Sequence, residues 1–410
     1  MATATVKGTF LEAARRFTEN LYHCSRCNYC VEASWEEKGL RHVCPTLLHH
    51  SPALSYSGKG YLATARALVD GEELSAVTVA DRLFACTTCG NCEEACPIGL
   101  QPAQLVKAMR ADLVDHGLAP DSALELAANI ASTGNPDGLP AAARYTWASE
   151  LRTDSGAAPE FLYLPGCAAC YGKPAEARAT VALLGAAGVR VATLTVDRDR
   201  CCGAPLFETG QLAAGRRQGT ELLEAIRDSG ASAVLTSGAE CLESLRHHYP
   251  QYLQAGETVA AMHPLELLAD RISIQHLKLV ARKDSPPPAT VAMLDSCHLS
   301  KKGHGGLVET GYPRLARAIL AALGCRVVPD ESAARFALCC GAAGGMAQIH
   351  PDSSRRMALG KFESLRELEA GAIVSASPLC ASHLERSCGG STTPVYGLCE
   401  FIMAHFEARG

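Results

Sequence analysis

The sequence predicts an α/β protein in which a helical N-terminal domain precedes two α/β units with mainly parallel sheets, related by a pseudo-twofold axis. Three observations predict this fold. Strand-like and helix-like segments alternate from residue 161 onward, their order repeats once, and each copy contains the triplet Cys-Cys-Gly. We therefore expect an N-terminal domain at 1–118, a linker at 119–160, a first α/β unit at 161–285 and a second at 286–410.

Composition narrows the class of protein. A chain of 410 residues can form proper hydrophobic cores, so its 20 cysteines are not needed to cross-link a small secreted fold. The net charge of −5 argues against a nucleic-acid-binding surface. Residues 1–8 lack the apolar run of a signal peptide, and uncharged stretches such as 336–351 are too short to span a bilayer. We expect a cytoplasmic protein whose thiols bind metal, associated with membranes only through partners.

Two cysteine runs mark the N-terminal domain. The run Cys86-x-x-Cys89-x-x-Cys92-x-x-x-Cys96-Pro97 has the spacing of bacterial ferredoxins, in which the fourth cysteine binds the other of two 4Fe–4S clusters. The earlier run Cys24-x-x-Cys27-x-x-Cys30 has the same spacing as the first three cysteines of this pattern. Two clusters are therefore predicted, one held by Cys24, Cys27, Cys30 and Cys96, the other by Cys86, Cys89, Cys92 and Cys44.

The assignment of Cys44 depends on the crossover. Cys44-Pro45 follows Cys30 after 13 residues instead of three, and an insertion at 31–43 can bulge outward because Cys44 serves the distant cluster. Paired zinc sites are the alternative, but zinc sites use separate C-x-x-C hooks, so this spacing favours clusters. Helices are expected at 61–70, 73–84, 101–116 and 122–132.

Beyond a Pro-, Gly- and Ala-containing stretch at 134–160, periodicity predicts the alternating elements. Expected strands are 161–164, 189–196, 233–237, 290–294, 326–328 and 372–376, and expected helices are 175–187, 212–228, 243–248, 313–323, 353–368 and 381–386.

Four cysteines recur in the same order in both α/β units. One ends a strand, two form the doublet on a loop, and one follows a later strand. The carboxyl ends of parallel strands share one edge of a sheet, so these thiols should converge on a metal centre. The predicted sets are Cys167, Cys201, Cys202 and Cys241 in the first unit, and Cys297, Cys339, Cys340 and Cys380 in the second.

The chain resembles the fused catalytic subunit of heterodisulfide reductase and its wider family, which includes the iron–sulfur subunits of glycolate oxidase and anaerobic glycerol-3-phosphate dehydrogenase. The resemblance extends over about residues 24–401. It is carried by the cysteine runs above and by Cys201-Cys-Gly-Ala-Pro-Leu, Ser296-Cys-His-Leu and Cys339-Cys-Gly-Ala-Ala-Gly-Gly. It implies a ferredoxin-type domain followed by two "CCG" cysteine-rich domains, complete copies of which can hold a noncubane 4Fe–4S cluster that cleaves disulfides.

This sequence departs from the family at one position in each unit. The family closes each unit with C-x-x-C, but Gly238 and Ser377 stand at the first of these positions. Each four-thiolate site could hold a noncubane cluster completed by another ligand, an ordinary cubane, or zinc. Cys170 is a candidate spare ligand, whereas Ser377 is a poor ligand for a soft metal. His298 and His383 are candidates to tune a cluster or move a proton, but hydrogen-bonded histidines at helix starts are the favoured interpretation.

The expected function is electron transfer. No Gly-x-Gly-x-x-Gly follows a strand, so a bound flavin or nicotinamide is not expected, and electrons must pass through a partner. Candidate partners are a flavoprotein, other redox subunits and a membrane subunit. The alternatives are a catalytic subunit reducing a disulfide or other small acceptor at a CCG-bound cluster, and a docking subunit with zinc in one or both CCG sites. The Ser57-Gly-Lys-Gly60 segment is interpreted as a structural turn.

Overall fold

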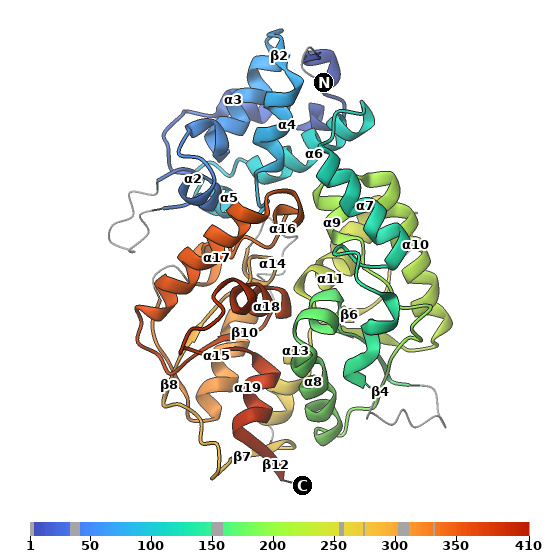
Figure 1. Cartoon of the computed structure of the whole chain (residues 1–410), viewed down its shortest axis with the longest axis vertical. Helices are drawn as coiled ribbons and strands as arrows, with labels where there is room; N and C mark the ends of the chain where they lie inside the picture. Colours follow the sequence, from blue (N-terminus) through green and yellow to red (C-terminus); the bar gives the residue numbers. More distant parts are fainter. Residues whose placement is uncertain are drawn as a thin grey trace.

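The computed structural model describes residues 4–32, 42–148, 159–253, 258–273, 275–301, 311–330 and 333–409. Figure 1 shows three parts: the N-terminal domain at one end of the molecule and two α/β units side by side beneath it, with the C-terminus at the opposite end. Most of the predicted insertion at 31–43 and part of the predicted linker lie outside the described residues. Among the described helices, none is long and apolar enough to cross a bilayer.

The N-terminal domain is helical, as predicted, and all four of the helices expected there lie within three residues of their expected bounds. Ser57 and Ser75 begin two of them by accepting hydrogen bonds from backbone N–H groups of the first turn, and Pro102 begins a third. A short antiparallel pair, β1 (Thr5–Val6) and β2 (Leu74–Ser75), lies at the far end. The helices are α1 (Thr18–His23), α2 (Pro45–His49), α3 (Gly58–Val69), α4 (Ala76–Phe84), α5 (Asn91–Glu94), α6 (Pro102–Asp115) and α7 (Asp121–Thr133).

Each α/β unit contains a four-stranded parallel sheet with the same strand order, which confirms the predicted repeat. In both units the first strand of the repeat pairs with the second and third, and the fourth pairs with the third. The fourth strands were not predicted, because two or three residues carry too little pattern. The strands are β3 (Phe161–Leu164), β4 (Val191–Ala192), β5 (Ala233–Thr236) and β6 (Ala261–Met262), then β8 (Thr290–Met293), β9 (Arg326–Val327), β10 (Ala372–Ser375) and β11 (Val395–Gly397).

Helices cover both sheets. The expected helix at 243–248 is part of a longer run, in which α11 leads into a π-helical turn at Ser244–His248. The first unit contains α8 (Pro174–Ala186), α9 (Ala204–Glu208), α10 (Leu212–Asp228), α11 (Ala239–Glu243), α12 (Tyr249–Tyr252) and α13 (Pro264–Ser273). The second contains α14 (Cys297–Ser300), α15 (Tyr312–Ala322), α16 (Met346–Ile349), α17 (Pro351–Arg366), α18 (Pro378–Ser387) and α19 (Leu398–His405).

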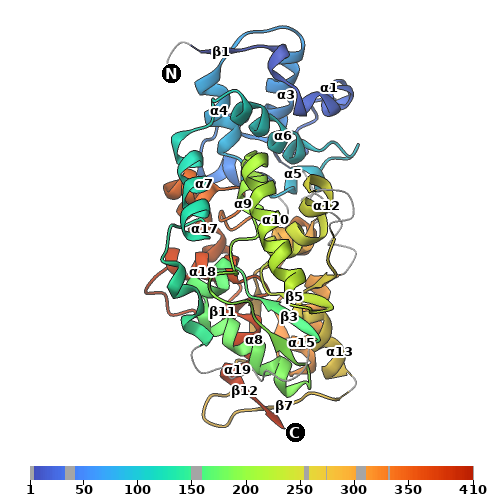
Figure 2. The ribbon, with the colours of Figure 1, turned by 90° about the vertical axis from the view of Figure 1, so that its right-hand side faces the viewer.

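The two units pack reciprocally, as a pseudo-twofold axis requires. Helix α8 of the first unit packs on α19 of the second, while the equivalent α15 packs on α13 of the first unit. At the end near the C-terminus, β7 (Lys278–Ala281) and β12 (Phe406–Arg409) form an antiparallel pair between the units. Figure 2 shows this pair far from the N-terminal domain.

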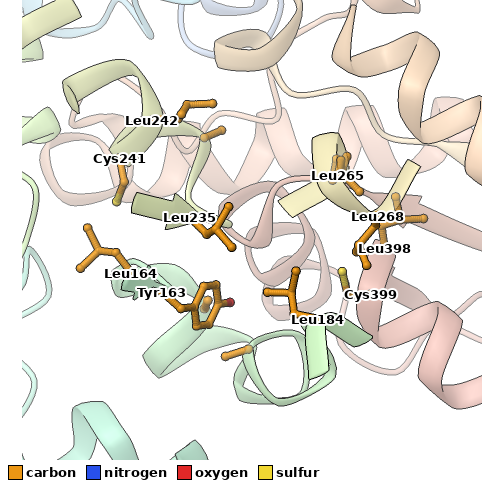
Figure 3. Close-up of a cluster of buried hydrophobic side chains, with 14 of the residues drawn as sticks. Tyr163, Leu164, Leu184, Leu235, Cys241, Leu242, Leu265, Leu268, Leu398 and Cys399 are labelled. Carbon is orange, nitrogen blue, oxygen red and sulfur yellow. The ribbon is translucent and has the colours of Figure 1, made fainter. Parts of the chain in front are cut away.

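The hydrophobic core is shared by both units. Figure 3 shows Leu184, Leu265 and Leu398 meeting at the junction, with Cys399 among them. Cys399 is 2% exposed and is a core residue. Cys241 lies at the other end of the same cluster, next to strand β5, so the core positions this candidate ligand directly.

Part of the predicted linker packs against the first unit. Residues Ala141–Ala148 form a 3-10 helical segment in which Arg144 and Trp147 are buried, and the Trp147 ring meets Tyr163 edge-on. The sequence of this segment shows little hydrophobic periodicity because the segment is short and buries only Arg144 and Trp147. The domain boundaries themselves stay a prediction.

Arg110 on α6 joins the three parts of the molecule. Its guanidinium is fully buried and donates to the carbonyl oxygens of Leu83 and Cys86 in the N-terminal domain. It also donates to the Glu208 carbonyl of the first unit at 2.9 Å and to the Gly344 carbonyl of the second at 3.0 Å. One side chain therefore fixes all three parts relative to one another.

Replacing Arg110 by Ala should lower the free energy of unfolding by about 3–5 kcal/mol, because several buried carbonyl groups lose their donor at once. Guanidinium unfolding followed by circular dichroism measures this. The matched control is Arg216→Ala on the exposed face of α10, expected to change stability by less than about 0.5 kcal/mol. If the two substitutions changed the free energy of unfolding equally, the hydrogen bonds of Arg110 would not stabilise the packing of the three parts.

Candidate metal centres

The first predicted ligand set gathers beside α1. Cys24, Cys27, Cys30 and Cys96 line one pocket, and the Leu100 N–H donates to the Cys96 Sγ at 3.3 Å. Burial raises the pKa of the Cys30 thiol to about 11, and neighbouring Cys24 and Cys96 add to the rise. The loop can wrap one centre because Arg26 and Asn28 adopt left-handed backbone angles. The structure therefore brings these four thiols together.

The second set includes the sequence-distant Cys44. Burial raises the pKa of Cys44 to about 12, and the next thiols that influence it are Cys86 and Cys89. Cys92 is likewise affected by Cys86 and Cys89, while the Thr88 N–H donates to the Cys86 Sγ at 3.3 Å. The structure thus places Cys44 beside the second run, the arrangement that the crossover assignment requires.

Gly58 separates the two sets. A Cβ atom at this position would lie 2.8 Å from the Cys92 Cβ and 3.3 Å from the Cys30 Cβ. Only glycine lets α3 start in this gap, so the Gly-Lys segment does more than make a turn. The adjacent Lys59 lines the first pocket, and its Nζ donates to Asn28 Oδ1.

The four thiols of the first α/β unit form a connected group. Cys201 is within hydrogen-bond reach of Cys167 and Cys202, and Cys202 of Cys241. Hydrogen bonds from Cys201 and Cys241 hold the pKa of Cys202 well below its usual range. The Gly203 N–H donates to the Cys201 Sγ at 3.4 Å, and Gly203 has the positive φ that the doublet loop needs.

The second unit repeats this geometry. Hydrogen bonds connect Cys297 to Cys339, Cys339 to Cys340, and Cys340 to Cys380. The Gly341 N–H donates to the Cys339 Sγ at 3.3 Å, as Gly203 does in the first unit. All four thiols of the second unit are buried, whereas Cys167 of the first is partly exposed.

Comparison with known families agrees with these sites. Residues 20–100 match the 4Fe-4S dicluster domain, and residues 161–246 and 291–385 each match the cysteine-rich CCG domain. The chain therefore contains one 4Fe-4S dicluster domain followed by two CCG domains, the domain order that the resemblance implied. The resemblance inferred from its cysteine motifs is therefore confirmed.

Its relatives include components of larger reductases. One component of the dihydromethanophenazine:CoB–CoM heterodisulfide reductase of Methanosarcina barkeri is 27% identical over 381 residues, covering 88% of this chain and 87% of the relative. A component of the fumarate reductase (CoM/CoB) of Methanothermobacter marburgensis is 27% identical over 380 residues, covering 90% and 68%. The EtfAB:quinone oxidoreductase of Syntrophomonas wolfei is 26% identical over 359 residues, covering 80% and 48%.

At the family's missing cysteine positions, this heterodisulfide reductase-like protein makes other contacts. A Cβ at Gly238 would lie 2.9 Å from the Cys241 Sγ, so glycine leaves that sulfur its space. Ser377 begins α18, where its hydroxyl accepts from the Cys380 N–H. Cys170 packs in the core near Trp147 and does not line the pocket at the first unit. The Ser377 hydroxyl is therefore already engaged with the backbone, and the Cys170 thiol lies in the core with Cys167 among the groups that influence it.

Two buried cations face the candidate ligands, and the sequence did not reveal either. Arg144 donates to the Cys167 Sγ at 3.6 Å and pairs with Asp199 at 3.1 Å. Lys301 is 0% exposed, and its Nζ donates to the Ala337 carbonyl oxygen. No carboxylate pairs with Lys301 among the described residues.

The position of Lys301 tests whether these thiols fit a metal. Burial raises the pKa of Cys89, and the Lys301 ammonium opposes that rise; the same ammonium acts on Cys297 and Cys339. A buried cation needs a negative partner, and hydrogen bonds from Cys297 and Cys340 hold the pKa of Cys339 well below its usual range, which favours a thiolate beside Lys301. Metal-bound thiolates from both neighbouring sets would supply the same negative charge, so the donor sets fit iron–sulfur clusters or zinc.

The histidines singled out from the sequence have ordinary polar partners. His298 Nε2 lies 2.9 Å from Glu208 and 3.3 Å from Glu243, and these carboxylates raise its pKa to about 10 despite burial. Lys107 adds a second cation beside Glu243. A third carboxylate, that of Glu240, lies 3.6 Å from His298 Nδ1, so His298 belongs to a buried ion-pair network. His383 lies 3.0 Å from the Ser354 hydroxyl.

Replacing Cys44 by Ser should remove the cluster signal of the Cys86 set and leave that of the Cys24 set, because only the former loses a ligand. Electron paramagnetic resonance of the reduced protein and iron content measure this. The matched variant, Cys96→Ser, should show the reverse pattern. If Cys44→Ser instead eliminated the Cys24 signal, the crossover assignment would be wrong.

Replacing Lys301 by Met should lower the reduction potentials of both centres that it adjoins, by on the order of 100 mV, because reduction adds a negative charge that the ammonium no longer stabilises. A redox titration followed by electron paramagnetic resonance measures each centre. Lys301→Arg keeps the charge and should shift the potentials much less, and the distant Cys24 set should not shift in either variant. Unchanged potentials in Lys301→Met would contradict this role.

Proposed function

We propose that this protein is an iron–sulfur electron-transfer subunit that passes electrons between a flavoprotein or ferredoxin-like partner and a terminal acceptor. The observation that carries the proposal is a continuous series of contacts between the four thiol sets. Clusters at these sites would supply the redox chemistry, while the chain positions, buries and tunes them.

The series begins in the N-terminal domain. Gly58 lies between Cys30 of the first set and Cys92 of the second. On the far side of the second set, Cys89 packs in one cluster of buried residues with Cys297, Cys339 and Ala343. The second α/β unit is therefore the direct neighbour of the N-terminal domain's inner centre.

The last step leads to the first unit. Ala342 and Leu379 flank the ligand cysteines of the second unit, and they line a pocket together with the candidate ligands of the first. The proposed order is the Cys24 set, the Cys44 set, the second unit and then the first unit. In this order the second unit, whose four thiols are buried, passes electrons on, and the first unit is the terminal site.

The pocket at the first unit favours a second candidate function, reduction of a small acceptor there. All four thiols of the first unit line this pocket, together with Gly238, and the opposite wall comes from α17 and α18 of the second unit. A disulfide or another small acceptor could reach the thiol set directly. We infer that any catalysis by this chain takes place at the first unit.

Partner subunits are proposed because relatives are named as parts of larger enzymes, including a heterodisulfide reductase. A flavoprotein would supply the two-electron chemistry that thiolate clusters alone do not. A membrane subunit is a further candidate partner.

Metal counting on anaerobically purified protein tests the proposal. About 16 iron atoms per chain and no zinc would support four clusters, whereas about eight iron atoms with one or two zinc ions would favour the docking alternative. Stepwise reduction should then show each cluster gaining electrons. Protein with about eight iron atoms, zinc in both CCG sites and redox activity confined to the N-terminal domain would overturn the proposed order.

A further inference from the structure

Two adjoining hollows cover the first thiol set. One is lined by Cys24, Cys27, Cys30 and Cys96, and the second lies next to it over Leu21, Leu62 and Ala63. Cys24, Arg26, Lys59 and Leu62 line both, so the two form one continuous surface. We call this surface the α1–α3 face.

The α1–α3 face is the part of the electron path that reaches solvent at the N-terminal end. Cys27 is the one exposed residue among the sixteen candidate ligands, and the other three cysteines of its set are partly exposed. Tyr22 and Ile98, beside Cys24 and Cys96 in the sequence, are 48% and 56% exposed. Exposed apolar side chains around an accessible redox centre are typical of transient protein contacts.

The face is positively charged. Arg26, Lys59 and Arg66 line the hollows, and no Asp or Glu lines either of them among the described residues. Arg66 pairs with Asp70 at 3.4 Å, but within the described part of the chain neither Arg26 nor Lys59 forms an ion pair. The whole chain has a net charge of −5, so this local excess is opposite in sign to the rest of the molecule.

We propose that the α1–α3 face is the docking surface for an electron-carrier protein whose own redox centre is surrounded by acidic residues. This inference rests on the proposed electron-transfer function and adds the charge of the partner. Opposite charges would orient such a carrier so that its redox centre faces Cys27, and the net negative charge on the rest of this protein would repel the carrier from other surfaces. One electron leaves the reduced carrier and enters the first thiol set's cluster, or the reverse.

A stopped-flow experiment with a reduced, acidic two-cluster ferredoxin as probe tests the proposal. We expect the second-order rate constant for electron transfer to fall about tenfold or more as salt rises from roughly 10 mM to 300 mM, because salt screens exposed charges. The charge-reversal variant Arg26→Glu/Lys59→Glu/Arg66→Glu should react about tenfold more slowly at low salt and lose the salt dependence.

The matched control reverses three exposed basic residues of the first α/β unit, Arg178→Glu/Arg216→Glu/Arg217→Glu. It changes the net charge equally and should alter the rate less than about threefold. Equal slowing by both triple variants would overturn the proposal, since net charge alone would then explain it. If Arg26→Glu disturbs the neighbouring ligands, as iron content would show, Lys59→Glu/Arg66→Glu is used with the two-residue control Arg216→Glu/Arg217→Glu.

Dithionite separates this inference from the proposed function. If dithionite reduces the clusters but the ferredoxin reaction is independent of salt in the unaltered protein, the docking face is refuted and the electron path stands. If dithionite leaves the visible absorbance unchanged, the electron-transfer function itself is refuted. A slower ferredoxin reaction in the charge-reversal variant of the α1–α3 face, but not in the control variant, supports both the docking surface and the electron-transfer function.

Discussion

The four thiol sets depend on how the three parts of the molecule are held against one another, and the Arg110 guanidinium is the one group described above that bonds to all three. Its donors reach carbonyl groups in the N-terminal domain and in both α/β units. The three parts pack tightly around Arg110, with no room for a side chain at two glycines. A Cβ on Gly344 would lie 2.7 Å from the Thr87 carbonyl carbon, and one on Gly210 would lie 2.4 Å from the Ala111 nitrogen. Leu83 lies in the last turn of α4 and Cys86 follows the helix, and the Cys86 carbonyl oxygen also accepts from Arg110, so the bonds that join the parts also fix a candidate ligand.

Charge balance is the second constraint. Burial raises the pKa of thiols such as Cys30 and Cys86 to about 11, so these groups are neutral until a metal displaces their protons. Arg144 and Lys301 are buried beside other candidate ligands, Cys167 and Cys339, whose pKa values are lowered. Arg144 pairs with Asp199, whereas no carboxylate pairs with Lys301 among the described residues, so metal-bound thiolates would supply the negative charge that faces Lys301. Loading of these sites would therefore stabilise the folded chain, and both cations would raise the potentials of clusters bound there.

Local pattern in the sequence predicted most of the fold and the composition of each site. Spacing alone predicted that Cys44 would lie with the Cys86 run, and the repeated order of strands and helices predicted two α/β units with mainly parallel sheets. Arg110, Arg144 and Lys301 could not be predicted, because each acts on residues of another part of the chain and no local pattern marks such a side chain. Gly58 was visible as part of Gly-Lys-Gly, but the reason for glycine is its contact with Cys30 and Cys92, which only the packed domain reveals.

The two α/β units show how position can distinguish copies of one motif. They share strand order, the glycine N–H bond to the doublet, and four thiols in one connected group. The second unit lies against the N-terminal domain's inner thiol set through Cys297 and Cys339, and its own thiols are buried. The thiols of the first unit instead line a pocket whose far wall is built by its twin. A relay needs insulation from solvent and a terminal site needs access to an acceptor, so in the proposed path the packing against the N-terminal domain, more than the ligand count, assigns the two roles.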